Sequence, residues 1–213
     1  MKKINLSLRS PSVLFLLITN LIPVYGVLFL DWKIFYLIFL FWLENVYLGF
    51  FNVLKMLCCC PSNGMNWLGK IFIVPFFTIH YGMFTAIHGI FVMLIFGSKA
   101  IQFKGFPDID VFLNILQMND LDWIALCLFL SHGFSFLWNY IGKKEYETTD
   151  LKTLMGKPYG RIVVLHLTIL IGGFLLMALK SPIVGLLLFI MLKIIMDISS
   201  HNKEHKIKKL VTD

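Results

Sequence analysis

Residues 32–57 read WKIFYLIFLFWLENVYLGFFNVLKML, an apolar run with one carboxylate, Glu44, near its centre. A helix of this length rises about 39 Å, which is enough to cross the ~30 Å hydrocarbon core of a bilayer. A charged side chain at the centre of a membrane costs roughly 2.5–3.5 kcal/mol even on insertion scales, so it persists where it has partners or a task. The stretch therefore predicts a membrane-spanning helix with a candidate functional residue inside it.

Apolar runs of similar length recur along the chain. Mean hydropathy is +0.81, and 15% of the residues are charged, against about 25% in soluble domains. We expect an all-α protein, an integral membrane bundle of six transmembrane helices that forms a single domain over residues 1–213. The predicted spans are 12–30, 32–57, 68–97, 121–141, 159–180 and 182–201.

The basic residues predict the orientation of the bundle. Fifteen of the 19 Lys and Arg residues lie in the N-terminus, the second and fourth connections and the C-terminal segment. Cytoplasmic loops carry this excess, so both termini are expected in the cytoplasm of a multi-pass cell (plasma) membrane protein. The net charge of +7 is explained in this way and does not indicate nucleic-acid binding. Of the two long connections, 98–120 is expected to contain a short interfacial helix, and 142–158 reads as a solvated loop.

Ionisable residues at similar depth on five different spans are the strongest sign of a shared site. Estimated at 1.5 Å per residue, their positions fall in the central to cytoplasmic layer of the bundle. The five are Glu44, His80, His132, His166 and Asp197. Other polar residues beside them or on the same helix faces are candidates for a supporting role: Asn45, His88, Ser135, Asn139, Arg161, Lys193 and His201.

Two of these supporting residues have a specific expectation. His88 lies about 12 Å further out than His80, which makes it difficult for both to bind one metal. Arg161, near the inner interface, is a candidate partner for either acid, Glu44 or Asp197.

Histidine and carboxylate without thiolate suit a catalytic zinc, which has three protein ligands and an open position for water. The cysteines, Cys58 to Cys60 and Cys127, contain no C-x-x-C pair. We expect His80, His132 and either His166 or Asp197 as ligands, with Glu44 as general base. A site at this depth would act on a lipid or a membrane-embedded peptide.

Three other functions stay open at this point. Buried Glu, Asp and His residues form proton paths in transporters; six helices make a thin pore, so this function also suggests a homo-oligomer. Histidines on facing helices could instead bind haem for electron transfer. Finally, the polar residues could only hold the bundle together, in a structural or partner-binding membrane protein.

The residue types resemble those of the ceramidase and progestin/adiponectin-receptor superfamily, which consists of seven-helix intramembrane zinc hydrolases. The pattern differs, because six spans are predicted and the last one carries Asp197-x-x-x-His201 in place of two histidines. The motif Gly133-Phe134-Ser135 resembles the G-x-S of rhomboid proteases, but His201 at the cytoplasmic end of its span is not level with Ser135. A serine protease is therefore not expected.

Three stretches carry a broader resemblance: Trp42–Asn45, His80-Tyr81-Gly82 through His88-Gly89, and Ser131-His132-Gly133. With these, the chain looks like an uncharacterised family of small prokaryotic polytopic membrane proteins. The resemblance implies the membrane architecture over most of the chain and implies no activity.

Overall fold

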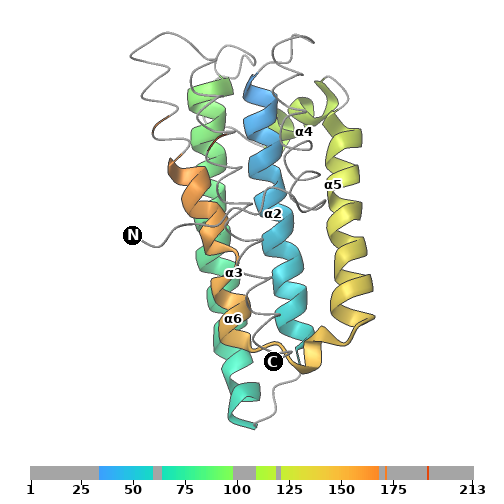
Figure 1. Cartoon of the computed structure of the whole chain (residues 1–213). Coiled ribbons are helices and arrows are strands. Elements are labelled where there is room, and N and C mark those ends of the chain that lie inside the picture. Colours follow the sequence, from blue (N-terminus) through green and yellow to red (C-terminus); the bar gives the residue numbers. More distant parts are fainter. Residues whose placement is uncertain are drawn as a thin grey trace, which may run out of the picture. The chain divides into compact units, whose positions relative to one another are not determined.

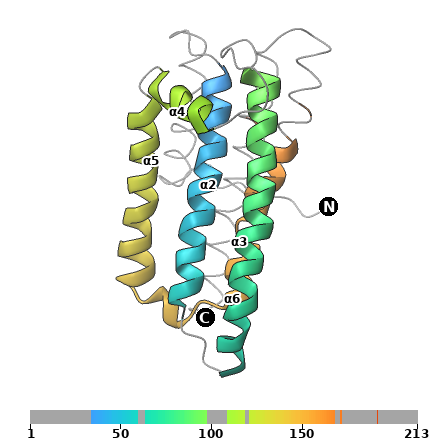
Figure 2. The same ribbon diagram turned by 180° about the vertical axis from the view of Figure 1, so that it is seen from behind.

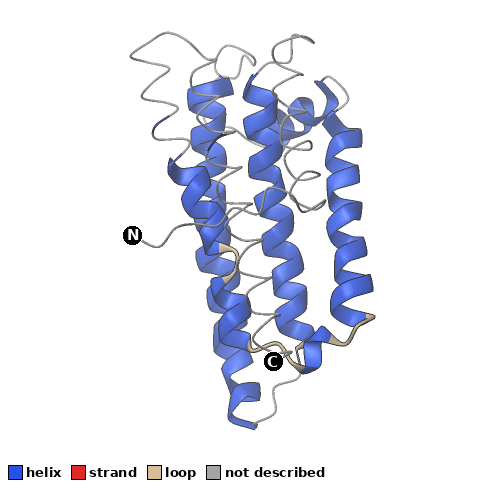
Figure 3. Ribbon diagram, in the orientation of Figure 1, coloured by secondary structure: helices blue, strands red, loops and turns tan. Residues whose placement is uncertain are grey.

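The structure is a computed structural model that describes residues 34–59, 64–97, 109–118 and 121–167, with Ile171 and Met191. In this part of the chain the residues are predominantly helical and no strand occurs, as Figure 3 shows. The all-α prediction is therefore confirmed for the described residues. All contacts described below lie within one compact unit, Phe35–Ile169.

Three long helices form the frame of this unit. They are α2 (Ile34–Cys58), α3 (Gly64–Val92), which continues as the π-helix η1 (Met93–Gly97), and α5 (Leu121–Ser135), which continues as the π-helix η3 (Phe136–Ile141). In both views, α2 lies between α3 and α5 (Figures 1 and 2).

Each long helix contains a segment that is long and apolar enough to cross a membrane, at Phe35–Cys58, Trp67–Gly97 and Leu121–Ile141. These bounds agree with three of the predicted spans to within three residues, and they indicate a membrane protein. The predicted spans 12–30 and 182–201, and most of 159–180, lie outside the described residues. The count of six, the single domain and the position of the termini stay predictions.

Two close contacts between α2 and α3 pair an aromatic ring with a glycine. A Cβ atom on Gly89 would lie 2.5 Å from the ring of Trp42, and a Cβ atom on Gly49 would lie 2.5 Å from the ring of Tyr81. Both rings are buried. Glycine allows membrane helices to approach closely, and here it makes room for two large rings. We call these four residues the aromatic–glycine seam.

Hydrogen bonds fix the position of both rings in the seam. Trp42 Nε1 donates to the carbonyl oxygen of Thr85 over 2.7 Å. Tyr81 Oη donates to the carbonyl oxygen of Asn45 over 3.1 Å. A buried indole or phenol usually finds such a partner, so each ring is held by a polar contact as well as by packing.

The connection 142–158 differs from the expected solvated loop. It forms a short 3₁₀ turn, η4 (Glu145–Glu147), and a short helix, α6 (Leu151–Gly156). Leu151 and Leu154 are buried in the apolar core that α2 and α3 also line. Their i, i+3 spacing puts both on one face of the helix, and the neighbouring Lys152 remains exposed.

A hydrogen bond shows how far α6 reaches along α2. Asn52 Nδ2 donates to the carbonyl oxygen of Leu154 over 2.9 Å. Asn52 lies six residues before Cys58, or about 9 Å along the helix axis. The segment therefore reaches into the bundle, and the helical residues 159–167 that follow begin deeper than the sequence predicts.

The predicted interfacial helix corresponds to α4 (Ile109–Gln117). Its Phe112 packs against Phe39 and Trp42, with ring centroids 5.5 and 5.8 Å apart. Ile115 is fully buried, whereas Ile109 is 76% exposed. The helix is thus amphipathic and covers the first turns of α2 (Figure 2).

Candidate functional site

Three side chains from three different helical segments meet around one carboxylate. Glu44, on α2, lies 2.9 Å from Nη2 of Arg161 through Oε2. Its other oxygen, Oε1, lies 3.5 Å from Nε2 of His132 on α5. Arg161 belongs to the segment 159–167. We call these three residues the Glu44 centre; their side chains are only 17–27% exposed.

Aromatic rings of α2 support both partners of Glu44. The imidazole of His132 stacks on the ring of Phe51, with centroids 6.4 Å apart. The guanidinium of Arg161 lies 5.8 Å from the centroid of Phe41. Phe41, Glu44 and Phe51 recur at three and seven residues, which puts them on one face of the helix. The cation–π contact adds attraction for the arginine in a poorly solvated place.

The charges of the centre follow from its chemistry. Arg161 carries a permanent positive charge, since a guanidinium is not deprotonated in proteins. It is the counter-charge of the Glu44 carboxylate. An imidazole exists in a neutral and a protonated form, so His132 can change the total charge of the centre. The three groups together are neutral when His132 is neutral, and they carry one positive charge when it is protonated.

His80 has a different partner from the one expected. Its Nδ1 lies 2.8 Å from the hydroxyl of Tyr159, and its ring stacks on Phe76 with an interplanar angle of 12°. Tyr159 was not among the predicted site residues. The available signal was its position at the start of a predicted span, two residues before Arg161.

His88 and His166 form a second polar pair. Nε2 of His88 lies 2.8 Å from Nδ1 of His166. Nδ1 of His88 lies 2.6 Å from the carbonyl oxygen of Phe84. A carbonyl only accepts, so Nδ1 of His88 carries a hydrogen and donates it. When His88 is neutral, its Nε2 accepts from Nδ1–H of His166.

The four predicted site residues that the structure describes are thus divided among three separate contacts. Glu44 and His132 are in contact, while His80 and His166 bind Tyr159 and His88. Among the residues that the structure describes, no three His, Cys, Asp or Glu side chains are arranged to hold a metal. Asp197, with its neighbours Lys193 and His201, lies outside the described residues.

The depth of the segment 159–167 explains these pairings. Because the segment begins deeper than predicted, His166 lies level with His88, which was expected to be too far out. Tyr159 and His166 are about 10 Å apart along their helix, close to the ~12 Å between His80 and His88. The same displacement brings Arg161 to the level of Glu44.

The other described candidates have hydrogen-bond partners of their own. Asn45 Nδ2 donates to the carbonyl oxygen of Phe41, and the residue is fully buried. Asn139 Nδ2 donates to Ser135 Oγ over 3.4 Å, and Lys143 Nζ donates to Asn139 Oδ1 over 2.7 Å. Ser135, Asn139 and Lys143 thus form a chain of hydrogen bonds that runs from the end of α5 through η3 into the turn after it.

The comparison with protein families gives one match, a model described as a family of unknown function, over residues 3–212. The chain belongs to the family DUF6498. No curated protein and no solved structure matches it. The match covers nearly the whole chain, including the Glu44 centre, the His80–Tyr159 contact and the His88–His166 pair. It attaches no activity to any of them.

Proposed function

We propose that this DUF6498 chain moves protons within a membrane, as part of a proton-coupled transport process, and that the Glu44 centre is where the proton is held. The observation that carries the proposal is the position of Glu44 between a permanent cation, Arg161, and a titratable imidazole, His132. A carboxylate–histidine pair at bilayer depth is a typical element of proton relays.

In the proposed mechanism, His132 takes up the proton on Nε2, the atom that faces Glu44 Oε1. The positive charge then shared by His132 and Arg161 exceeds the negative charge of Glu44. An uncompensated charge is costly at this depth. Protonation therefore favours a conformation in which the centre opens toward water or gains a counter-ion, and this couples the proton to movement of the helices.

The proposal includes the architecture expected from the sequence. The chain is a six-span protein of the cell membrane with both termini in the cytoplasm. In that orientation α2 runs inward and Glu44, some 15 Å from the outer end of the helix, lies near the middle of the bilayer.

The test is proton flux into liposomes that contain the purified protein and a trapped pH-sensitive dye, driven by an imposed membrane potential. Wild-type protein should carry more protons than empty liposomes, and Glu44→Gln and His132→Gln should each lower the flux at least tenfold. The control is Glu147→Gln, which changes an exposed carboxylate in η4. Flux equal to that of empty liposomes in the wild type, or full flux in Glu44→Gln, would reject the proposal.

A zinc-dependent hydrolase is the second candidate, with a lipid or membrane peptide as substrate. It is favoured by the contact between Glu44 and His132, two groups that are both able to bind zinc, and it requires a further ligand such as Asp197. Glu44, His132 and Asp197 would bind the ion, which would activate a water for hydrolysis. Metal analysis of protein extracted in mild detergent should then give one zinc per chain, reduced in His132→Gln. Less than a tenth of a zinc per chain would exclude this function.

A further inference from the structure

Polar side chains of α5 and η3 continue from the Glu44 centre in one direction. Asn139 Nδ2 donates to Ser135 Oγ over 3.4 Å, and Lys143 Nζ donates to Asn139 Oδ1 over 2.7 Å. Ser135 follows His132 by three residues, so the two are neighbours on the surface of the helix. A series of polar groups therefore leads from His132 to the turn after η3. We call Ser135, Asn139 and Lys143 the α5 polar strip.

The strip covers the distance from His132 to one membrane surface. The candidate span of α5 ends at Ile141, and His132 lies nine residues before this end, or about 13 Å at the rise of a helix. This is close to half of the ~30 Å hydrocarbon core. Tyr140 Oη donates to the carbonyl oxygen of Lys55, in the last turn of α2. The two spans therefore end at the same level.

Beyond His132, in the opposite direction, the same face of α5 is apolar and closed. Ala125 and Leu121 precede His132 by seven and eleven residues, which places them on its face of the helix. They are 4% and 3% exposed, respectively. Ser135 and Lys143 are exposed instead. The surroundings of His132 are thus polar and open toward one membrane surface, and apolar and packed toward the other.

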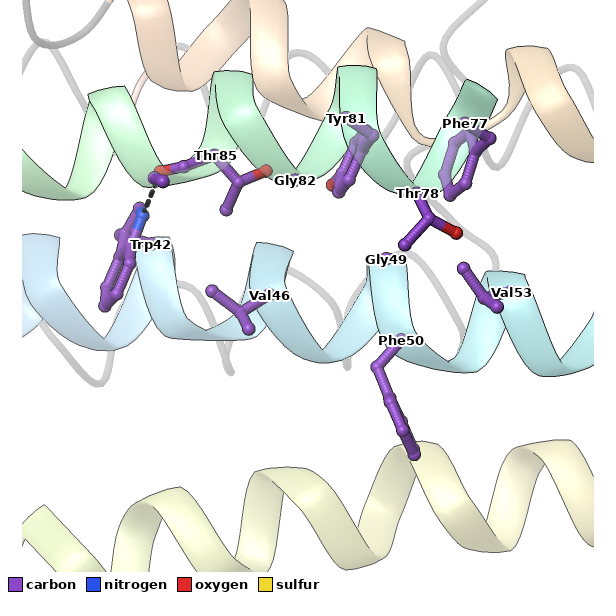
Figure 4. Close-up of a pocket in the computed structure, with 11 residues that line it drawn as sticks. Trp42, Val46, Gly49, Phe50, Val53, Phe77, Thr78, Tyr81, Gly82 and Thr85 are labelled. Carbon is purple, nitrogen blue, oxygen red and sulfur yellow. Dashed lines mark hydrogen bonds between the residues drawn. The ribbon is translucent and has the colours of Figure 1, made fainter. Parts of the chain in front are cut away.

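The groove between α2 and α3 has a different character. It has a volume of about 400 Å³ and is lined mainly by aliphatic and aromatic side chains, such as Val46, Val53 and Phe77 in Figure 4. The hydroxyls of Thr78 and Tyr81 in its walls both donate to backbone carbonyl oxygens. Ordered water needs several polar partners, and apolar cavities stay dry. The α5 polar strip suits water better than this groove does.

We infer that water reaches the Glu44 centre along the α5 polar strip, from the membrane surface at the Lys143 end. The Asn139 amide and the Ser135 hydroxyl are costly against hydrocarbon and well placed beside water. The inference rests on the proposed function for what this water carries: a hydronium ion gives its proton to the imidazole of His132 and leaves as water. In the proposed orientation this surface is cytoplasmic, so the centre exchanges its proton with the cytoplasm.

The experiment measures how fast single cysteines react with a charged, membrane-impermeant methanethiosulfonate reagent. It uses full-length protein in membrane vesicles, with the four native cysteines replaced by serine. Lys143→Cys, in the turn after η3, identifies the side of the membrane at which the strip ends. Reagent on this side should label Ser135→Cys at least tenfold faster than Phe134→Cys, and reagent on the other side should label neither.

Phe134 is the matched control because it lies one residue from Ser135 in depth and its side chain is 64% exposed. It points about 100° away from Ser135 around the helix axis. Equal rates at the two positions would overturn the inference, and so would reaction of Ser135→Cys only from the side opposite Lys143→Cys. No reaction of Ser135→Cys from either side, in protein that keeps its helical circular dichroism, would mean that another helix covers the strip, and the inference would then be wrong.

Labelling does not depend on proton flux, so the inference and the proposed function fail separately. If the wild type carries no protons and Ser135→Cys still reacts as expected, the aqueous route stands and the Glu44 centre has another task. Where flux is present, Asn139→Leu, with an apolar side chain of similar size, should lower it at least fivefold. Asn139→Gln keeps the amide and should retain at least half of the flux. Full flux in folded Asn139→Leu would overturn the strip as the route of the proton.

Discussion

The two faces of α2 contact their neighbours through different kinds of interaction, steric on one face and ionic on the other. Toward α3, Trp42 and Gly49 belong to the aromatic–glycine seam, where contact is steric and the rings are less than 10% exposed. Toward α5 and the segment 159–167, Glu44 binds His132 and Arg161. Trp42 and Glu44 are two residues, or about 200°, apart on the helix.

This difference shows how one helix can be rigid and responsive at once. Steric contacts of the seam keep one geometry, since an added methyl group has no free space there. The ionic contacts of the Glu44 centre change strength with one proton on His132. A seam that fixes α2 against α3 allows a charge change on the opposite face to act on α5 and on the segment 159–167. The predictions below separate the two faces.

The largest effect is expected from Arg161→Met, which leaves Glu44 without its permanent cation. Breaking a largely buried ion pair by removing one partner is strongly destabilising, and we expect a loss of about 4 kcal/mol in the free energy of unfolding. The measurement is denaturant or thermal unfolding of detergent-solubilised protein, followed by helical circular dichroism.

A double variant sharpens this prediction. Arg161→Met combined with Glu44→Gln removes both charges, and it should recover at least half of the lost stability. Lys157→Met removes an exposed positive charge from the same part of the chain and should change stability little. If the double variant is less stable than Arg161→Met alone, the ion pair is not what holds this face together.

The second largest effect is expected from Leu154→Ala in α6. Leu154 is 1% exposed, and a buried Leu→Ala change costs about 3 kcal/mol through lost burial and the cavity it leaves. Because α6 sets the depth of Arg161, the proposed proton flux should fall as well. Leu137→Ala is the control, since that side chain is 64% exposed. Equal stability of the two variants would show that α6 is not anchored in the core.

The sequence predicted the long helices well, because bilayer thickness sets their length and hydropathy marks their ends. It also predicted that Glu44 and His132 lie at the same depth. Both results depend on position along a helix, which a constant rise per residue gives directly.

The rest depends on rotation and on the connection before Arg161. The sequence 142–158 carries seven charged residues, which favour a solvated loop. The pattern of charges hides the apolar pair Leu151 and Leu154, which anchors the segment in the core. The resulting error in depth assigned His166 to the wrong neighbours. Tyr159 was missed for the same reason, because the predicted depth of its segment puts it far from His80.

The third prediction concerns the seam. Gly89→Ala places a methyl group 2.5 Å from the Trp42 ring, and such overpacking costs about 2 kcal/mol. Gly82→Ala, on the same helix, meets nothing and should stabilise α3 slightly, since alanine is the better helix former. Unfolding of the two variants measured side by side provides the check. Equal stability would mean that the two helices separate easily and that the seam is not rigid.

The smallest effect is expected from His166→Phe, which tests whether the His88–His166 pair belongs to the seam side or to the charged side of the molecule. The new ring keeps the aromatic contact with His88, whose centroid is 5.0 Å away, and it removes the donor to Nε2. One interhelical hydrogen bond in a membrane protein is worth about 0.6 kcal/mol on average, so stability should fall by about 1 kcal/mol or less. Proton flux in liposomes should stay within twofold of the wild type, in contrast to His132→Gln. A tenfold loss of flux would place His166 on the same proton path as Glu44, and the proton would then pass from the charged face of α2 to the α3 side.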